Sequence, residues 1–225
     1  MTWGILVLAL GCTLEAEVLK KYFKDGKNLK SITTYKDGTI SKIGKGVKHG
    51  EEKVYYVNGK VAYEVNYVDG KRDGSFRWYE EDNGALVKNV HYKMGRFHGS
   101  DKTYYPDGTL EHEVNYVDDK KVGLQKDYYS TGQLAIVVNY INGKKEGIQK
   151  RYNQDGTLYS DVFYKNNFKE GKEKVYDKDG KLVKAERHKL DRPIDIMKKV
   201  QAKKPDITEE TFKGMNFNPK EHKLH

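Results

Sequence analysis

Apolar and polar residues alternate along short segments of the chain, so that every second residue is apolar. Segment 61–67 shows this pattern clearly, and segment 134–140 repeats it. The apolar members are Val61, Tyr63, Val65 and Tyr67 in the first segment and Leu134, Ile136, Val138 and Tyr140 in the second. Because successive side chains of a strand point to opposite faces, this alternation predicts β-strands with one face at least half-buried. The three- and four-residue spacing of an amphipathic helix does not occur in these segments.

Three columns of residues recur with these strands. A leading glycine returns every 24 or 25 residues, a second glycine follows nine or ten residues later, and a tyrosine lies five positions after each leading glycine. The leading glycines are Gly50, Gly74, Gly99, Gly123, Gly147 and Gly171, the second glycines are Gly59, Gly84, Gly108, Gly132, Gly156 and Gly180, and the tyrosines are Tyr55, Tyr79, Tyr104, Tyr128, Tyr152 and Tyr176. A fixed period in the range of about 20–50 residues indicates a repeat architecture.

Turn-forming residues separate the predicted strands. The second glycine usually follows Asn or Asp, as in Asn58-Gly59 and Asp107-Gly108, which is typical of type I′ hairpin turns. Other turns are rich in Gly, Asn and Lys, for example at residues 142–145, and the leading glycines are expected to end strands. Since hairpin follows hairpin with no room for a crossover helix, we predict an all-β fold: an elongated, single-layer antiparallel meander of tandem β-hairpin repeats, with about 14 strands.

The combined pattern is Gly-x4-Tyr-Tyr-x2-Gly-x-Leu-x3-Val-x-Tyr-x2-Gly-x3-Gly. It closely resembles the bacterial variant of the MORN repeat, regularly over residues 50–190 and in a degenerate form over 18–49. The resemblance implies a module that acts through protein contacts or at membranes rather than by catalysis. Some similar repeat proteins are described as antitoxins, so the resemblance also leaves open a neutralising protein of the cytoplasm.

The N-terminus predicts export. Trp3 to Gly11 form a nine-residue apolar run, too short to span a bilayer and typical of the apolar part of a signal peptide. Cleavage after Ala16 would remove residues 1–16, whereas a sequence similar to a lipoprotein box ends at Cys12 and makes it a lipidation candidate. We therefore expect an exported protein, periplasmic or associated with the outer membrane. The alternatives are that the apolar run forms the first strand and that the protein is cytoplasmic.

The chain divides into three parts on this interpretation: a signal peptide at residues 1–16, a repeat sheet at 17–190 and a C-terminal tail at 191–225. The boundary before the tail is at Asp191-Arg192-Pro193, since the residue before proline is biased away from helix. The tail is expected to form short helices that cover the open sheet edge or to be disordered.

The net charge is +9, from 42 basic and 33 acidic residues. Such a balance favours anionic partners, although lysines that protect exposed strands from aggregation produce the same balance. Nucleic acid is disfavoured because no helix-turn-helix, zinc-finger or RNP-like motif appears. An anionic membrane surface stays open as a partner.

A basic column is the main candidate binding site. A Lys or Arg lies three positions after each leading glycine, on the same strand parity as the tyrosine two positions further on. These residues are Lys53, Arg77, Lys102, Lys126, Lys150 and Lys174. Equivalent strands are two apart, so neighbouring cations are expected about 9.6 Å apart, at a spacing suited to an extended anionic surface. The alternative is that each lysine stem packs over a tyrosine ring of its own repeat.

The sequence offers no catalytic constellation. The seven histidines are scattered, there is one cysteine, and neither H-E-x-x-H, a phosphate-binding G-x-x-x-x-G-K-[ST] loop nor G-x-S-x-G occurs. We therefore expect no metal, no cofactor and no enzymatic activity. The predicted function is that of an exported binding or scaffold module, which contacts an unidentified protein or the envelope surface through its Tyr/Lys face. The alternatives are an antitoxin-like protein and, more distantly, a module that binds anionic lipid.

Overall fold

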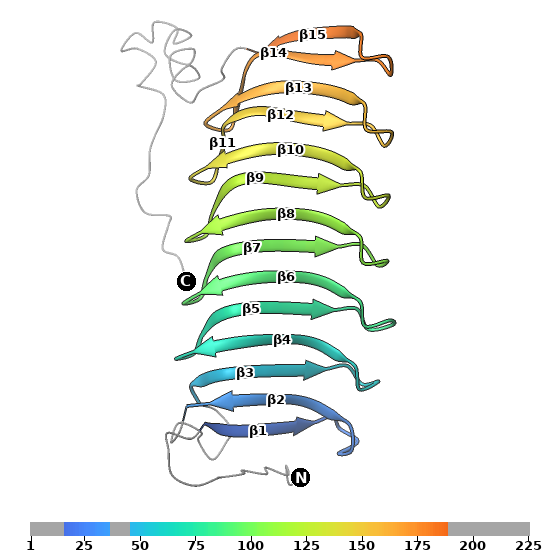
Figure 1. Ribbon diagram of the computed structural model, residues 1–225. Coiled ribbons are helices and arrows are strands. Elements are labelled where there is room, and N and C mark those ends of the chain that lie inside the picture. Colours follow the sequence, from blue (N-terminus) through green and yellow to red (C-terminus); the bar gives the residue numbers. More distant parts are fainter. Residues whose placement is uncertain (1–15, 37–45, 189–225) are drawn as a thin grey trace, which may run out of the picture.

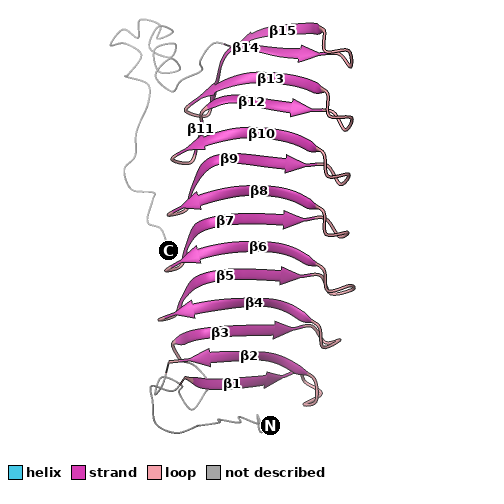
Figure 2. Ribbon diagram, in the orientation of Figure 1, coloured by secondary structure: helices cyan, strands magenta, loops and turns pink. Residues whose placement is uncertain are grey.

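The computed structural model describes residues 16–36 and 46–188, which form one antiparallel sheet of 15 strands (Figures 1 and 2). Neighbours in sequence are neighbours in the sheet throughout, except that the two-residue β11 pairs only with β10, so that β12 also joins β10. No helix occurs in these two ranges. The all-β meander of tandem hairpins is confirmed.

The strands have the following bounds: β1 Glu17–Tyr22, β2 Leu29–Tyr35, β3 Lys48–Tyr55, β4 Val61–Val68, β5 Lys71–Tyr79, β6 Leu86–Lys93, β7 Arg96–Tyr104, β8 Leu110–Val117, β9 Lys120–Tyr128, β10 Leu134–Ile141, β11 Lys144–Lys145, β12 Gly147–Tyr152, β13 Leu158–Lys165, β14 Phe168–Tyr176 and β15 Leu182–His188. The predicted signal peptide, with Cys12, lies outside the described ranges except for Ala16, and the predicted tail after residue 190 lies outside them entirely. No helix that is long and apolar enough to cross a bilayer is found within them.

The two edges of the sheet carry different turns, and one turn prediction is wrong. The Asn-Gly and Asp-Gly pairs that contain the second glycines do not form type I′ turns, because only the glycine has a positive φ, as in Gly59 with φ +85°. The amide of Gly59 donates to the carbonyl of Tyr56, and Tyr56 N donates to Lys60 O, which closes a three-residue loop. This arrangement is a type I turn followed by a left-handed glycine, the second common kind of hairpin turn.

Two successive residues with positive φ, as a type I′ turn requires, occur instead at the opposite edge. Asn142 and Gly143 have φ of +52° and +79°, and Asp118 and Asp119 have φ of +47° and +67°. These turns join β10 to β11 and β8 to β9 with only two residues each. The number of residues between the strands, and not the Asn-Gly pair itself, therefore selects the turn type.

The single 25-residue interval in the glycine repeat is explained by one turn. In the turn between β5 and β6, Gly84 N donates to Glu80 O, four residues earlier, whereas the corresponding bond elsewhere spans three residues. The extra residue enlarges the loop, and the strands on either side keep the register of the other repeats.

The prediction that the leading glycines end strands is also wrong. Five of them lie inside strands and Gly147 is the first residue of β12, and all six have φ between +72° and +102°. At Gly74, Val65 of β4 pairs with Phe76 of β5, but Tyr67 pairs with Arg72, so three residues of β5 face one residue of β4. Each leading glycine thus belongs to a β-bulge, where a positive φ is needed and the strand bends.

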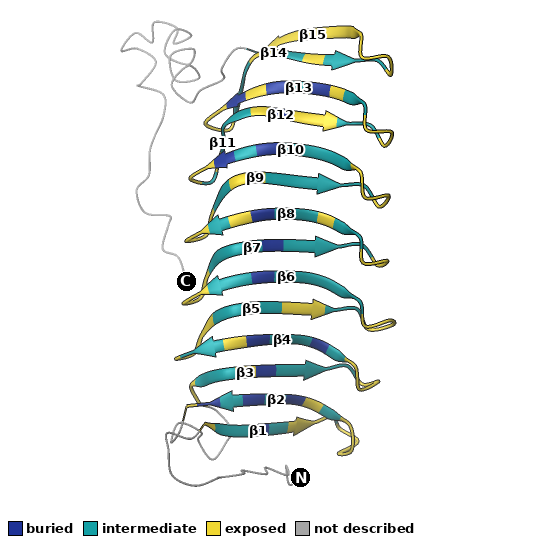
Figure 3. Ribbon diagram, in the orientation of Figure 1, coloured by how far each residue is buried: buried dark blue, intermediate teal, exposed yellow. Residues whose placement is uncertain are grey.

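A row of valines on one face of the sheet forms the centre of the core, and Leu19, Tyr35, Tyr140 and Tyr164 are buried as well. Val65, Val90, Val114, Val138 and Val162 are only 1–2 % exposed, and they appear as dark segments in the middle of alternate strands in Figure 3. Since the described residues form one sheet, side chains on adjacent strands cover these valines. We call this side the valine face. The other side carries the predicted basic column, and we call it the ladder face after the row of charged side chains described below.

Hydrogen bonds between consecutive repeats run along both edges. At the edge with longer loops, the hydroxyl groups of Tyr56, Tyr105 and Tyr129 donate to backbone carbonyls 23 residues later, at 2.7–2.9 Å. At the other edge, turn amides donate to carbonyls of the preceding repeat, for example Gly143 N to Lys121 O at 2.8 Å. Each repeat is therefore joined to its neighbours at three places: the two edges and the strand ladder between them.

Candidate binding face

The ladder face brings the predicted basic and tyrosine columns together, as strand parity predicted. The basic residues occupy every second strand of β3 to β14, and each tyrosine of the column lies two residues further along the same strand. Two tyrosine hydroxyls donate to the row of charges: Tyr79 Oη lies 2.9 Å from Glu64 Oε1, and Tyr128 Oη lies 3.0 Å from Glu113 Oε1.

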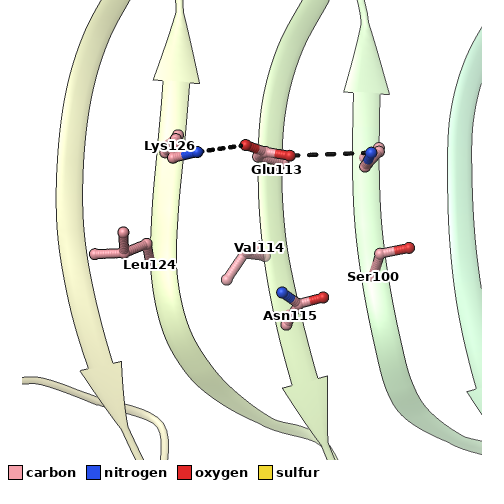
Figure 4. Close-up of a pocket in the computed structure, with 7 residues that line it drawn as sticks. Ser100, Glu113, Val114, Asn115, Leu124 and Lys126 are labelled. Atoms are coloured by element: carbon pink, nitrogen blue, oxygen red, sulfur yellow. Dashed lines mark hydrogen bonds and ion pairs between the residues drawn. The ribbon is translucent and has the colours of Figure 1, made fainter.

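Acidic residues alternate with the basic column, which the sequence reasoning missed. Glu64 on β4 pairs in register with both Lys53 and Arg77, and its carboxylate lies 3.8 Å from Lys53 Nζ and 2.9 Å from Arg77 Nη1. Glu113 on β8 lies between Lys102, at 4.0 Å, and Lys126, at 3.1 Å. Figure 4 shows this arrangement as a line of charges across three strands. The column is therefore a ladder of alternating charge.

The two glutamates hold their negative charge more firmly than glutamate in water. Burial raises the pKa of Glu64, but hydrogen bonds from Arg77 and Tyr79 outweigh it, so that the pKa lies below its ordinary value. The same balance lowers the pKa of Glu113, where the donors are Lys126 and Tyr128. The hydrogen bond to Glu113 in turn raises the pKa of Lys126. Both glutamates are therefore ionised at neutral pH.

The ladder is interrupted at two positions where an acidic residue is replaced. Asn89 lies between Arg77 and Lys102, and Val137 lies between Lys126 and Lys150. Asp161 restores the pattern, with Lys174 Nζ at 4.0 Å and Tyr176 Oη at 2.6 Å. Within the part of the chain that the structure describes, Lys150 is exposed and makes no ion pair.

The ladder face is hollowed beside Glu113. A shallow depression of about 470 Å³ is lined by Ser100, Lys102, Glu113, Val114, Asn115, Leu124 and Lys126, most of which are labelled in Figure 4. A second depression of about 430 Å³ lies further along the sheet, at the edge with longer loops, and is lined by Tyr129, Ala135, Ile136, Arg151, Tyr152, Asn153 and Tyr159. Ile136 and Arg151 belong to the valine face, so this depression is not confined to the ladder face. Both are open, which suits contact with a macromolecular surface better than enclosure of a small ligand.

Basic residues that pack over tyrosine rings lie on the valine face, in a second column that the sequence reasoning also missed. Lys48 Nζ lies 4.8 Å from the ring centre of Tyr67, and Lys145 Nζ lies 4.9 Å from that of Tyr164. Arg72 over Tyr92 and Lys121 over Tyr140 repeat the contact at 5.3 and 5.1 Å. The signal was present as a basic residue two positions before most leading glycines. This column stabilises the repeat, as the alternative for the first column proposed.

The partners of this second column change along the sheet. Lys48 and Lys169 make ion pairs with Glu52 and Glu173, both at 2.6 Å, whereas the equivalent partner of Lys145 is neutral Gln149. Burial, together with the charges of Arg151 and Lys121, lowers the pKa of Lys145. The valine face thus keeps its lysines close to the protein, with their stems over aromatic rings.

Histidines take part in structural contacts. His112 Nδ1 lies against the carboxylate of Asp127. Burial raises the pKa of Asp127, but hydrogen bonds from His112 and Gln125 outweigh burial, so that this pKa lies below its ordinary value. His188 Nε2 lies 2.9 Å from Glu173, at the position where earlier repeats have a strand tyrosine. No group of three His, Cys, Asp or Glu residues that could hold a metal ion is found among residues 16–36 and 46–188.

Fold and face together define a repeat protein in which each hairpin of about 24 residues adds one pair of strands to a single sheet. The family model described as MORN repeat variant matches residues 48–69, 97–118, 121–142, 145–166 and 169–189. The chain belongs to this family of repeats. The matched segments leave out the repeat with the enlarged turn at Gly84. No curated protein matches the chain significantly.

Proposed function

We propose that the chain is a binding or scaffold module that contacts a protein partner through the ladder face. The observation that supports this most is the unbalanced charge of the ladder. Six basic side chains are set against three acidic ones on the strands between them, Glu64, Glu113 and Asp161, and Glu51 adds a fourth beside Lys53, at 3.2 Å on the same strand. The five basic residues that form ion pairs are still 35–46 % exposed. A partner with negative charge would therefore meet accessible cations already held in place by their neighbours.

The two faces can be compared directly with adjacent residues. Lys150 and Arg151 are both exposed, but they point to opposite faces of β12, since Lys150 pairs with Asp161 and Arg151 pairs with buried Ser160. A photo-crosslinking residue placed at Lys150 should capture the partner in cells, and the same residue at Arg151 should not. Capture only from Arg151 would place the contact on the valine face and contradict the proposal.

We further propose that the module acts outside the cytoplasm, at the cell envelope, on the basis of the apolar run from Trp3 to Gly11. Mass spectrometry of the native protein should find an N-terminus at Glu17 or a lipidated Cys12. An intact Met1 in the soluble fraction would favour the alternative, an antitoxin-like protein that neutralises its target in the cytoplasm. In either compartment the ladder face is the proposed contact surface, so the location and the surface are tested independently.

A further inference from the structure

Exposed apolar side chains gather on the ladder face in the C-terminal half of the sheet. Parity and strand pairing place five of them there, each 41–53 % exposed: Val117, Leu124, Ile141, Ile148 and Phe163. The positions equivalent to Leu124 and Ile148 in the first three regular repeats are polar, namely Glu51, Ser75 and Ser100. The patch is therefore specific to this half of the sheet, and exposed apolar patches of this kind mark contact surfaces.

The same region has the least compensated positive charge of the ladder. Val137 stands where the ladder elsewhere has Glu64, Glu113 or Asp161, so no carboxylate lies between Lys126 and Lys150. Lys120 and Lys144 add exposed positive charge on the same face, because they pair with Val117 and Ile141. An occupant of the patch must therefore combine apolar side chains with negative charge.

The spacing of the patch identifies the shape of this occupant. Leu124 and Ile148 lie on β9 and β12, two strands apart, and so do Lys126 and Lys150, which corresponds to about 9.6 Å. Residues seven apart on one face of an α-helix are separated by about 10.5 Å. In an extended chain, residues on one side are separated by about 6.6 or 13 Å, and neither distance fits. The mismatch of about 1 Å per repeat for the helix limits a good fit to two or three repeats.

We infer that strands β9 to β13 dock an acidic amphipathic α-helix of a protein partner, with its axis running across the strands. The inference rests on the proposed function, because it specifies the kind of protein segment that the ladder face would bind. Apolar residues one heptad apart would cover Leu124 and Ile148, and acidic residues on the flank would meet Lys126 and Lys150. A helix can place its carboxylates beside these lysines and away from Glu113 and Asp161. An anionic bilayer cannot, because it brings negative charge against both carboxylates at once.

The test uses a synthetic helical peptide of 21 residues, with Leu at every seventh position and Glu on the adjacent flank, and fluorescence anisotropy with the full chain. Ile148→Ser and Lys150→Gln should each weaken binding about tenfold, as for central contacts of an interface. Arg151→Gln, on the opposite face, and Val57→Ser, at an exposed loop, are the matched controls and should leave binding unchanged. All four positions are exposed, so the variants should fold, and circular dichroism checks this.

The remaining outcomes separate this inference from the proposed function. Equal binding of a peptide with the same composition in scrambled order would overturn the inference, because the heptad spacing would then be irrelevant. Failure of the peptide, together with capture of the partner by a crosslinker at Lys53 in the other half of the ladder, would overturn it and leave the binding module intact. Failure of every crosslinking position on the ladder face would overturn both.

Two further measurements assign the patch to another occupant if the inference is wrong. Binding of vesicles with 30 % anionic lipid that Ile148→Ser abolishes, without binding of the peptide, would show that the patch meets a membrane. A concentration-dependent increase in mass in sedimentation, abolished by the same substitution, would show that a second copy of the chain covers it. Either result would overturn the acidic helix as the occupant.

Discussion

Two valines on one strand test whether a single-layer sheet contains a real core. Val114 and Val117 both lie on β8, three residues apart, and they point to opposite faces. Val114 is 2 % exposed and Val117 is 45 % exposed. Replacing Val114 with Ala removes two buried carbon atoms, which corresponds to a transfer free energy of about 1.6 kcal/mol. The space left behind raises the expected loss of unfolding free energy to about 2 kcal/mol.

The same change at Val117 removes side-chain atoms that are already half in water, and we expect a loss of about 0.5 kcal/mol. The lower strand propensity of alanine affects both variants, so the difference between them reports burial. Urea unfolding should be followed by far-ultraviolet circular dichroism and by tyrosine fluorescence, since coincident curves are needed for a two-state analysis. Equal losses for the two variants would refute the view that neighbouring strands alone bury the valine row.

Four other substitutions test the ladder, the bulges and the turns. Since the pKa of Glu113 in the folded protein is below its ordinary value of 4.5, its contribution to stability is present above that pH and is lost as the pH falls through the folded pKa. The difference in urea midpoint between wild type and Glu113→Gln should therefore become smaller as the pH is lowered. A difference that does not change with pH would contradict a stabilising role of the ionised Glu113 carboxylate. Gly147→Ala should cost about 1–2 kcal/mol from its positive φ alone. Gly99→Ala should cost more, because its Cβ would lie 3.0 Å from His91 Cβ; equal thermal shifts would show that the bulge absorbs the contact. Met94, which is exposed, has φ +49° in a two-residue turn, so Met94→Asn should stabilise the protein by about 0.5 kcal/mol, and a lower melting temperature would contradict this.

Strand parity was sufficient to predict the columns of the repeat. It placed Lys126 and Tyr128 on one face, and the structure agrees. It did not bring Glu113 beside them, because that contact depends on the pairing between β8 and β9 and not on the order of residues within a strand. Aligning the two strands of each hairpin residue by residue would have placed Glu113 opposite Lys126 and Val137 opposite the same lysine. The alternating charge and its interruption at Val137 would then have been visible.

The bulges and the turn types could not be predicted from the periodic pattern of residues, for a different reason. A period of two counts residues along one strand, but a bulge is a difference in count between two strands, as between β4 and β5 around Gly74. Likewise, Asn58-Gly59 and Asn142-Gly143 are the same dipeptide in different turns, because the first is enclosed by a three-residue loop and the second by a two-residue loop. In both cases the number of residues between paired positions of two strands decides the conformation, and the pattern along one strand does not contain that number.

The hydrogen bonds that join consecutive repeats at both edges have a consequence for how the chain folds. Each connects residues about 23 positions apart, and strand pairing links only consecutive hairpins along the whole sheet. No part of the described sheet has to wait for a distant segment, so loop closure is inexpensive in entropy and a hairpin can be added as soon as it exists. During synthesis, a growing chain would therefore fold repeat by repeat behind the ribosome, with the newest strand serving as the template for the next.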